Sequence, residues 1–156
     1  RHRIDVVSGI DTMEIEWLAY AGIVAIGWLS SIGGYIEFKK SLAGGGFVCR
    51  ADQKSMINCK SVYVIPQAFL LGRYHLSAVA PVFFTAVLAP AVVGLLTGIE
   101  QLLLGSLIVL AMGALTVPYL VYLELRIARA ICLWCTVMHA SMILGSIIGL
   151  LAALGS

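Results

Sequence analysis

Residues 76–123 read LSAVAPVFFTAVLAPAVVGLLTGIEQLLLGSLIVLAMGALTVPYLVYL. One acidic residue, Glu100, divides this stretch into uncharged runs of 24 residues (76–99) and 23 residues (101–123). A helix needs about 20 apolar residues to cross the ~30 Å hydrocarbon core of a bilayer, where each backbone amide must be hydrogen-bonded within the segment. Each run therefore predicts one membrane-spanning helix.

Two further uncharged runs flank this pair. Residues 17–36 form a run of 20, and residues 130–156 form a run of 27 that holds one histidine. The composition agrees, since 61% of the 156 residues are hydrophobic, 12% are charged and the net charge is +2, whereas soluble domains are about 45–50% apolar and about 25% charged. A soluble globular domain, a disordered chain and a nucleic-acid-binding protein are therefore excluded.

The expected fold class is an all-α integral membrane protein, a bundle of four transmembrane helices with a capping loop and a short interfacial helix. We expect one membrane domain over residues 1–156, with helices at about 15–38, 76–99, 101–123 and 131–154 and an active-site loop at 39–75. The chain starts with Arg1, so Met13 is a candidate natural start and residues 1–12 would then be foreign or processed sequence. The acidic start at Met13–Glu16 and the long apolar run after it argue against a cleavable signal peptide.

The connection between the first two helices, residues 37–75, is unusually long, because bundle connections typically have about 2–8 residues. It ends in an apolar segment, VYVIPQAFLL at 62–71, which is about half the length of a membrane span. This segment predicts a short helix that lies on or dips into the membrane interface as a lid. The alternative is that it lengthens the second helix beyond an interruption at Gly72 and Arg73.

All four cysteines are expected on one face of the membrane. Cys49 and Cys59 lie in the long loop, and Cys132 and Cys135 form the motif CLWC at the start of the fourth helix. Because the chain crosses four times, the long loop and the connection between helices 3 and 4 emerge on the same side. Both cysteine pairs therefore share that side.

The CLWC motif occupies a position that suits thiol redox chemistry. The unpaired amides and the positive dipole end at the first turn of a helix stabilise a thiolate, and the cations Arg126 and Arg129 add to this. A redox-active pair is the favoured interpretation. A four-cysteine zinc site and a purely structural disulfide remain alternatives, although nine residues separate the loop cysteines and zinc sites usually have closely spaced pairs. No metal is predicted.

His139 is the only ionisable residue besides the cysteines within the fourth helix. It lies seven residues after Cys132 and four after Cys135, so the three side chains share one helix face. Ionisable groups inside a membrane are costly and are functional candidates by default. His139 is therefore a candidate to bind or protonate an oxygen of a quinone, and the alternative is a histidine hydrogen-bonded to a neighbouring helix.

These features together resemble the vitamin K epoxide reductase family. The resemblance covers residues 14–154 and is carried by Cys49, by Cys59 with Val62 after it, and by the CLWC motif with His139. It implies a four-helix bundle around a quinone, and electrons that pass from a thioredoxin-like partner to the loop cysteines, then to the CLWC motif and then to the quinone. It also implies that Cys49 faces the partner, that Cys59 exchanges with Cys132, and that Cys135 stacks against the quinone ring.

This sequence departs from the family pattern at three places. His139 stands where the animal enzymes commonly have tyrosine, Ile65 stands where members usually carry Ser or Thr, and no asparagine in the second helix matches the one that binds the quinone oxygen. Epoxide reduction is therefore less expected than plain quinone reduction.

The expected function is a quinone-dependent protein-disulfide oxidoreductase that oxidises a thioredoxin-like partner and so promotes protein disulfide formation. Its expected cofactor is a quinone of the ubiquinone or menaquinone type, and its other partner is membrane lipid. Two alternatives are a vitamin K epoxide or quinone reductase that uses a dithiol donor, and a non-catalytic membrane scaffold stabilised by disulfides. A transporter or channel would require several intramembrane polar groups, and only His139 is evident.

Charge bias and family precedent disagree about orientation. Eight cations lie on the cysteine side: Lys39, Lys40, Arg50, Lys54, Lys60, Arg73, Arg126 and Arg129. The opposite side has only Arg1 and Arg3. Because loops rich in Lys and Arg usually stay on the cytoplasmic side of a membrane, this bias places the cysteine face of the multi-pass protein in the cytoplasm. Family members usually have the cysteine face on the extracytoplasmic side.

Overall fold

The computed structural model describes residues 12–44, 57–70 and 73–155. Four of its helices are long and apolar enough to cross a membrane: Ile15–Ser41, Leu76–Thr97, Glu100–Ala128 and Leu133–Gly155. The expected fold class, an all-α multi-pass membrane protein, is confirmed.

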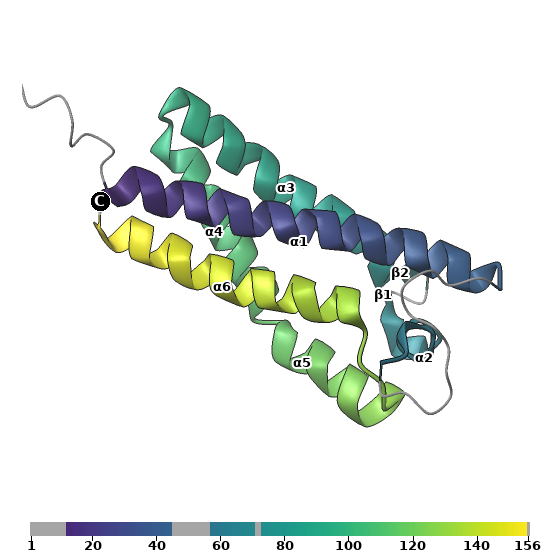
Figure 1. Ribbon diagram of the computed structural model, residues 1–156. Helices are drawn as coiled ribbons and strands as arrows, with labels where there is room; N and C mark the ends of the chain where they lie inside the picture. Colours follow the sequence, from purple (N-terminus) through teal and green to yellow (C-terminus); the bar gives the residue numbers. More distant parts are fainter. Residues whose placement is uncertain (1–11, 45–56, 71–72, 156) are drawn as a thin grey trace, which may run out of the picture.

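The structure has ten elements in the described residues. In chain order they are α1 (Thr12–Leu42), α2 (Cys59–Tyr63), the 3₁₀-helix η1 (Pro66–Ala68), strands β1 (Phe69–Leu70) and β2 (Tyr74–His75), α3 (Leu76–Thr97), α4 (Glu100–Ala114), α5 (Val117–Tyr122), the π-helix η2 (Leu123–Ala128) and α6 (Leu133–Gly155). Helices α1 and α4 each pack against both α3 and α6, which closes the bundle, and Figure 1 shows α2 and the strands gathered at one end of it.

The helices bury one side and leave the other side apolar and exposed. Tyr20, Phe84 and Leu110 are fully buried where the helices meet, whereas Leu96 and Leu154 keep 82% and 76% of their surface exposed. Helices that are apolar all round are suited to a lipid solvent. A buried hydrogen bond of 3.0 Å joins the hydroxyls of Tyr20 and Ser106 and links α1 to α4, as is common between membrane helices.

The third span differs from the sequence expectation. The sequence placed its end at residue 123, and the structure continues the helical segment to Ala128. The segment breaks at Leu115 and Thr116, just before Pro118, whose ring and missing amide hydrogen favour the first turn of a new helix. The last six residues, 123–128, then form a π-helix, a form that is frequent at functional sites.

The short helix of the long loop also lies elsewhere than expected. It is α2, at Cys59–Tyr63, and the Asn58 side chain caps its first turn by accepting a hydrogen bond of 3.3 Å from the Ser61 amide. Only η1 and β1 follow within the described part of segment 62–71, and β1 pairs antiparallel with β2. Because this hairpin separates α2 from α3, the described residues contradict the alternative of a lengthened second helix.

Candidate active site

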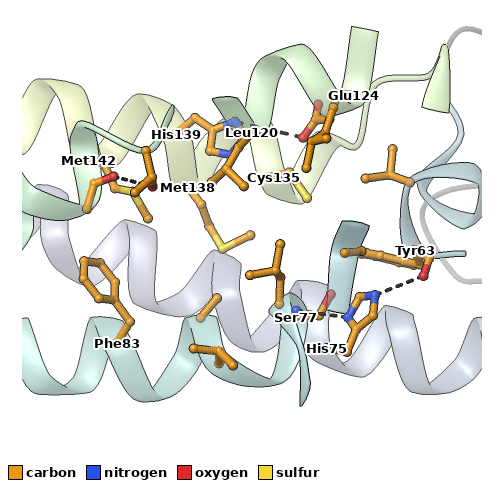
Figure 2. A pocket seen from close by; sticks show the side chains of 18 of the residues that line it. Tyr63, His75, Ser77, Phe83, Leu120, Glu124, Cys135, Met138, His139 and Met142 are labelled. Carbon is orange, nitrogen blue, oxygen red and sulfur yellow. Dashed lines mark hydrogen bonds and ion pairs between the residues drawn. The ribbon is translucent and has the colours of Figure 1, made fainter. Parts of the chain in front are cut away.

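A cavity of about 270 Å³ lies at the cysteine end of the bundle. Apolar side chains such as Phe83, Leu120 and Met142 form much of its wall, and Figure 2 shows polar groups and the Cys135 thiol facing the same space. Hydroxyl, imidazole, carboxyl and thiol groups in this wall come from residues that include Tyr63, His75, Ser77, Glu124, Cys135 and His139. They come from α2, β2, α3, η2 and α6, so the cavity depends on the whole fold.

Cys132 and Cys135 are free thiols at the first turn of α6. Cys132 is fully buried and immediately precedes the helix, and its carbonyl accepts hydrogen bonds from the Thr136 amide (2.9 Å) and hydroxyl (3.0 Å). The pKa of Cys132 is lowered, first by a hydrogen bond from the Cys135 thiol and then by the Cys135 amide and the Tyr63 hydroxyl, against the opposing effect of burial. Of the contributions expected from the sequence, the amide of Cys135 at the helix start lowers this pKa, whereas neither Arg126 nor Arg129 is among its causes.

Cys59 is held near Cys132 by a backbone pairing that links the loop to the start of α6. Ile57 and Ile131 form a parallel bridge, and the Asn58 amide donates a hydrogen bond of 3.1 Å to the Ile131 carbonyl. Cys59 follows this bridge in the loop and Cys132 follows it at the start of α6, and the two cysteines belong to one buried apolar cluster. Cys59 is disulfide-bonded, and Cys49 lies outside the described residues.

Tyr63 lies between the cysteines and α1. Its hydroxyl donates a hydrogen bond of 3.2 Å to the Gly34 carbonyl, and its oxygen is 3.6 Å from the Cys132 sulfur. Burial, followed by the nearby Cys132, raises the pKa of Tyr63. The phenol therefore keeps its proton: its oxygen accepts from the Cys132 thiol, and once Cys132 is ionised the hydroxyl can turn from the Gly34 carbonyl and donate to the thiolate.

Replacing Tyr63 with phenylalanine is expected to raise the pH at which Cys132 becomes reactive. The hydroxyl stabilises the thiolate and lowers the pKa of Cys132, so its removal lets that pKa rise. The measurement is the pH dependence of iodoacetamide modification of Cys132 in the reduced protein, read by mass spectrometry. Tyr74→Phe changes an exposed tyrosine and is the matched control. An unchanged midpoint in Tyr63→Phe would contradict a role of the phenol.

His75 joins the hairpin to the start of α3. Its Nδ1 accepts a hydrogen bond of 3.1 Å from the Ser77 amide, so the neutral ring carries its proton on Nε2, which donates to the Tyr63 carbonyl at 3.0 Å. The ring stacks on Phe38 with 3.9 Å between centroids. Burial lowers the pKa of His75, which favours this neutral form.

Glu124 is buried beside both cysteines of the CLWC motif. Its carboxylate interacts with the Cys132 amide and the Cys135 thiol, and one oxygen is 4.0 Å from Nδ1 of His139. The sequence interpretation placed Glu124 in a connection and missed it. A signal was present, because Glu124 is the only acidic residue between Glu100 and the C-terminus and lies eight residues before Cys132.

The structure brings Cys135, His139 and Ile65 to the wall of one cavity. Ile65 therefore contributes an apolar surface at the position where the resemblance leads one to expect a hydroxyl. Within residues 12–44, 57–70 and 73–155, no group of three or more His, Cys, Asp or Glu side chains is arranged to hold a metal ion.

Comparison with known families decides the relationship. The family model described as "Vitamin K epoxide reductase family" matches residues 18–150. The chain belongs to the vitamin K epoxide reductase family. The resemblance inferred from the cysteine pattern is thereby confirmed, and a search of curated proteins finds no match. Membership of the vitamin K epoxide reductase family indicates a membrane oxidoreductase whose chemistry involves quinone and thiols.

The cavity suits the head group of the quinones associated with the vitamin K epoxide reductase family. Small-molecule sites typically have volumes of about 300–1,000 Å³ and apolar walls with few polar groups, and this cavity lies close to the lower limit of that range. Its apolar wall would hold a ring, and Cys135 and His139 would face the ring atoms and oxygens. Such a quinone would supply a two-electron, two-proton acceptor.

Proposed function

We propose that this protein oxidises a thioredoxin-like partner and passes the electrons through two cysteine pairs to a membrane quinone, of the ubiquinone or menaquinone type. The observation that carries the proposal is the position of Cys135 in the wall of the cavity, with Cys132 behind it in the same apolar cluster as Cys59. The order Cys59, Cys132, Cys135 therefore matches a path for electrons from the loop to the cavity.

The path consists of two disulfide exchanges and one two-electron transfer. A partner thiolate attacks Cys49 of a disulfide between Cys49 and Cys59, and the second partner thiol resolves the mixed disulfide, so that the partner leaves oxidised and both loop cysteines are reduced. The Cys59 thiolate then attacks Cys132 of a disulfide between Cys132 and Cys135, and Cys49 resolves the bond between Cys59 and Cys132, which leaves Cys132 and Cys135 both reduced. Cys135 then delivers the electrons into the cavity. Quinones are stronger oxidants than protein dithiols, and every 30 mV of difference adds about 1.4 kcal/mol to the driving force.

Plain quinone reduction is favoured over epoxide reduction by the character of the cavity wall. Ile65 lines the cavity with an apolar surface, and the sequence has no asparagine in α3, Leu76–Thr97. The hydroxyl and amide groups that the family resemblance implies at these places are therefore missing.

The proposal is tested with purified protein, a reduced thioredoxin-like protein and a short-chain menaquinone or ubiquinone. The expected result is loss of quinone absorbance at a rate that depends on both protein concentrations, with dithiothreitol as an alternative donor. Omission of the membrane protein is the control. Quinone consumption no faster than in that control would contradict the proposal, and an inert protein would favour the scaffold alternative.

The charge bias leads us to propose further that the cysteine face is cytoplasmic. In a chain whose four cysteines are changed to serine, Lys60→Cys places a probe at an exposed position of α2, and Thr97→Cys places the matched probe at an exposed position at the opposite end of α3. A membrane-impermeant maleimide applied to intact cells is expected to label Thr97→Cys and not Lys60→Cys. The opposite labelling would establish the extracytoplasmic orientation that is usual in the family.

A further inference from the structure

Glu124 and His139 form a buried carboxylate–imidazole pair beside the redox cysteines. Both residues are at least nine-tenths buried, at 6% and 8% exposed, and both line the cavity. Ionisable groups are costly in membrane spans and usually serve the bound ligand or ion. Electron transfer through Cys132 and Cys135 does not itself require either group, so the pair calls for a separate role.

The contacts of the pair form an ordered series. At one end, the Glu124 carboxyl group interacts with the Cys135 thiol and accepts a hydrogen bond from the Cys132 amide. At the other end, His139 lies one helical turn beyond Cys135 on the same face of α6. The 4.0 Å between Glu124 and Nδ1 of His139 is within reach of a small side-chain movement, and such contacts often tighten when substrate binds. Figure 2 shows both residues on the same side of the cavity.

We infer that Glu124 and His139 are the proton route of this site: Glu124 takes the thiol proton of Cys135, and His139 passes a proton to a quinone oxygen in the cavity. The inference rests on the proposed function, because it concerns the protons that accompany those electrons. Oxidation of the pair, with Cys132 as thiolate and Cys135 as thiol, breaks one S–H bond, forms one S–S bond and releases two electrons and one proton. Reduction of a quinone to the hydroquinone forms two O–H bonds: one takes this proton by way of Glu124 and His139, and the other takes from water the proton that Cys132 released when it ionised, so no further reactant is needed.

The role of Glu124 is tested first without quinone. In reduced protein, iodoacetamide modification of Cys135 is followed by mass spectrometry of its peptide, since only the thiolate reacts. Glu124→Gln retains an oxygen that can accept the Cys132 amide but cannot take a proton, and it removes the negative charge that opposes ionisation of the Cys135 thiol, so it is expected to speed the modification. Glu124→Asp keeps this charge, and Cys135 is then expected to be modified at close to the wild-type rate. Glu100→Gln is the matched control, because Glu100 is exposed at the far end of the same span.

A second measurement, single-turnover quinone reduction by the pre-reduced protein, distinguishes the role of Glu124 from that of His139. Glu124→Gln is expected to slow quinone reduction by roughly 10²-fold, because the proton acceptor is lost, while it speeds the modification of Cys135. His139→Gln is expected to slow quinone reduction to a similar extent and to leave the modification rate unchanged, because Glu124 and its charge remain beside the thiol.

The outcomes distinguish this inference from the proposed function. If wild-type protein reduces quinone and Glu124→Gln and His139→Gln do so equally fast, the proton route is overturned and the proposed function stands. If the wild type reduces no quinone, the proposed function fails, and an unchanged Cys135 modification rate in Glu124→Gln would overturn the role of Glu124 independently. If Glu124→Gln does not fold, His139→Gln decides: selective loss of quinone reduction supports the route, and full activity overturns it.

Discussion

Replacing Cys135 with alanine is expected to abolish quinone reduction, to more than about 10³-fold below wild type, as losses of an essential reactive group do. Among the residues that the structure describes, Cys135 is the only cysteine in the wall of the cavity. Without it, Cys132 can still exchange with the loop but cannot reach the acceptor. The measurement is the loss of quinone absorbance with a reduced partner. Thr97→Ala, at the opposite end of α3, is the control.

The same variant is expected to accumulate a mixed disulfide. The Cys132 thiolate can attack the disulfide that contains Cys59, its neighbour in the apolar cluster, and no Cys135 thiol remains to resolve the new bond. Mass spectrometry of peptides from non-reduced protein should therefore detect Cys59 linked to Cys132. Quinone reduction that persisted in Cys135→Ala would remove the basis of the proposed function.

Replacing His75 with alanine is expected to lower the free energy of unfolding by roughly 2–4 kcal/mol. The change removes the cap of α3, worth about 1 kcal/mol, and leaves the buried Tyr63 carbonyl without its donor, at a cost of about 1–3 kcal/mol. The stacking on Phe38 is lost as well. Thermal unfolding in detergent measures the effect. His75→Asn restores a capping side chain and should recover about 1 kcal/mol of the loss.

His75 also predicts a pH dependence of stability. Its folded-state pKa lies below the ordinary value of 6.5, so between the two values the unfolded chain binds a proton that the folded protein does not. Stability is therefore expected to fall as the pH drops through 6.5 towards the folded pKa, and this contribution should be absent in His75→Ala. An identical pH profile in wild type and variant would contradict it.

The four spans could be predicted from the sequence because the bilayer leaves the backbone few choices. An uncharged run of some 20 residues must satisfy its own hydrogen bonds, and a helix does so. The CLWC motif could be placed at the start of the fourth helix for the same reason. The motif begins two residues after the start of the uncharged run 130–156, so it is expected at the first turn of that helix. Cys132 has its lowered pKa there.

The remainder of the site depends on backbone features that leave no periodic signal in the sequence. The single bridge between Ile57 and Ile131 joins residues far apart in the chain, and it brings Cys59 and Cys132 together. Glu124 faces the cavity because the third span breaks at Leu115 and ends as a π-helix, which alters the direction of every side chain after the break. Propensities and apolar runs describe neither feature.

The length of the broken third span has a consequence for the depth of the chemistry in the membrane. Its 29 residues, Glu100–Ala128, would measure about 44 Å as a continuous helix, whereas the 22 residues of α3 measure about 33 Å and match the ~30 Å of hydrocarbon. The end of η2 should therefore rise into the headgroup layer, and Glu124, four residues before that end, should lie buried in the protein just below it. At this depth a quinone ring could exchange protons with the aqueous phase while its isoprenoid tail stayed among the acyl chains.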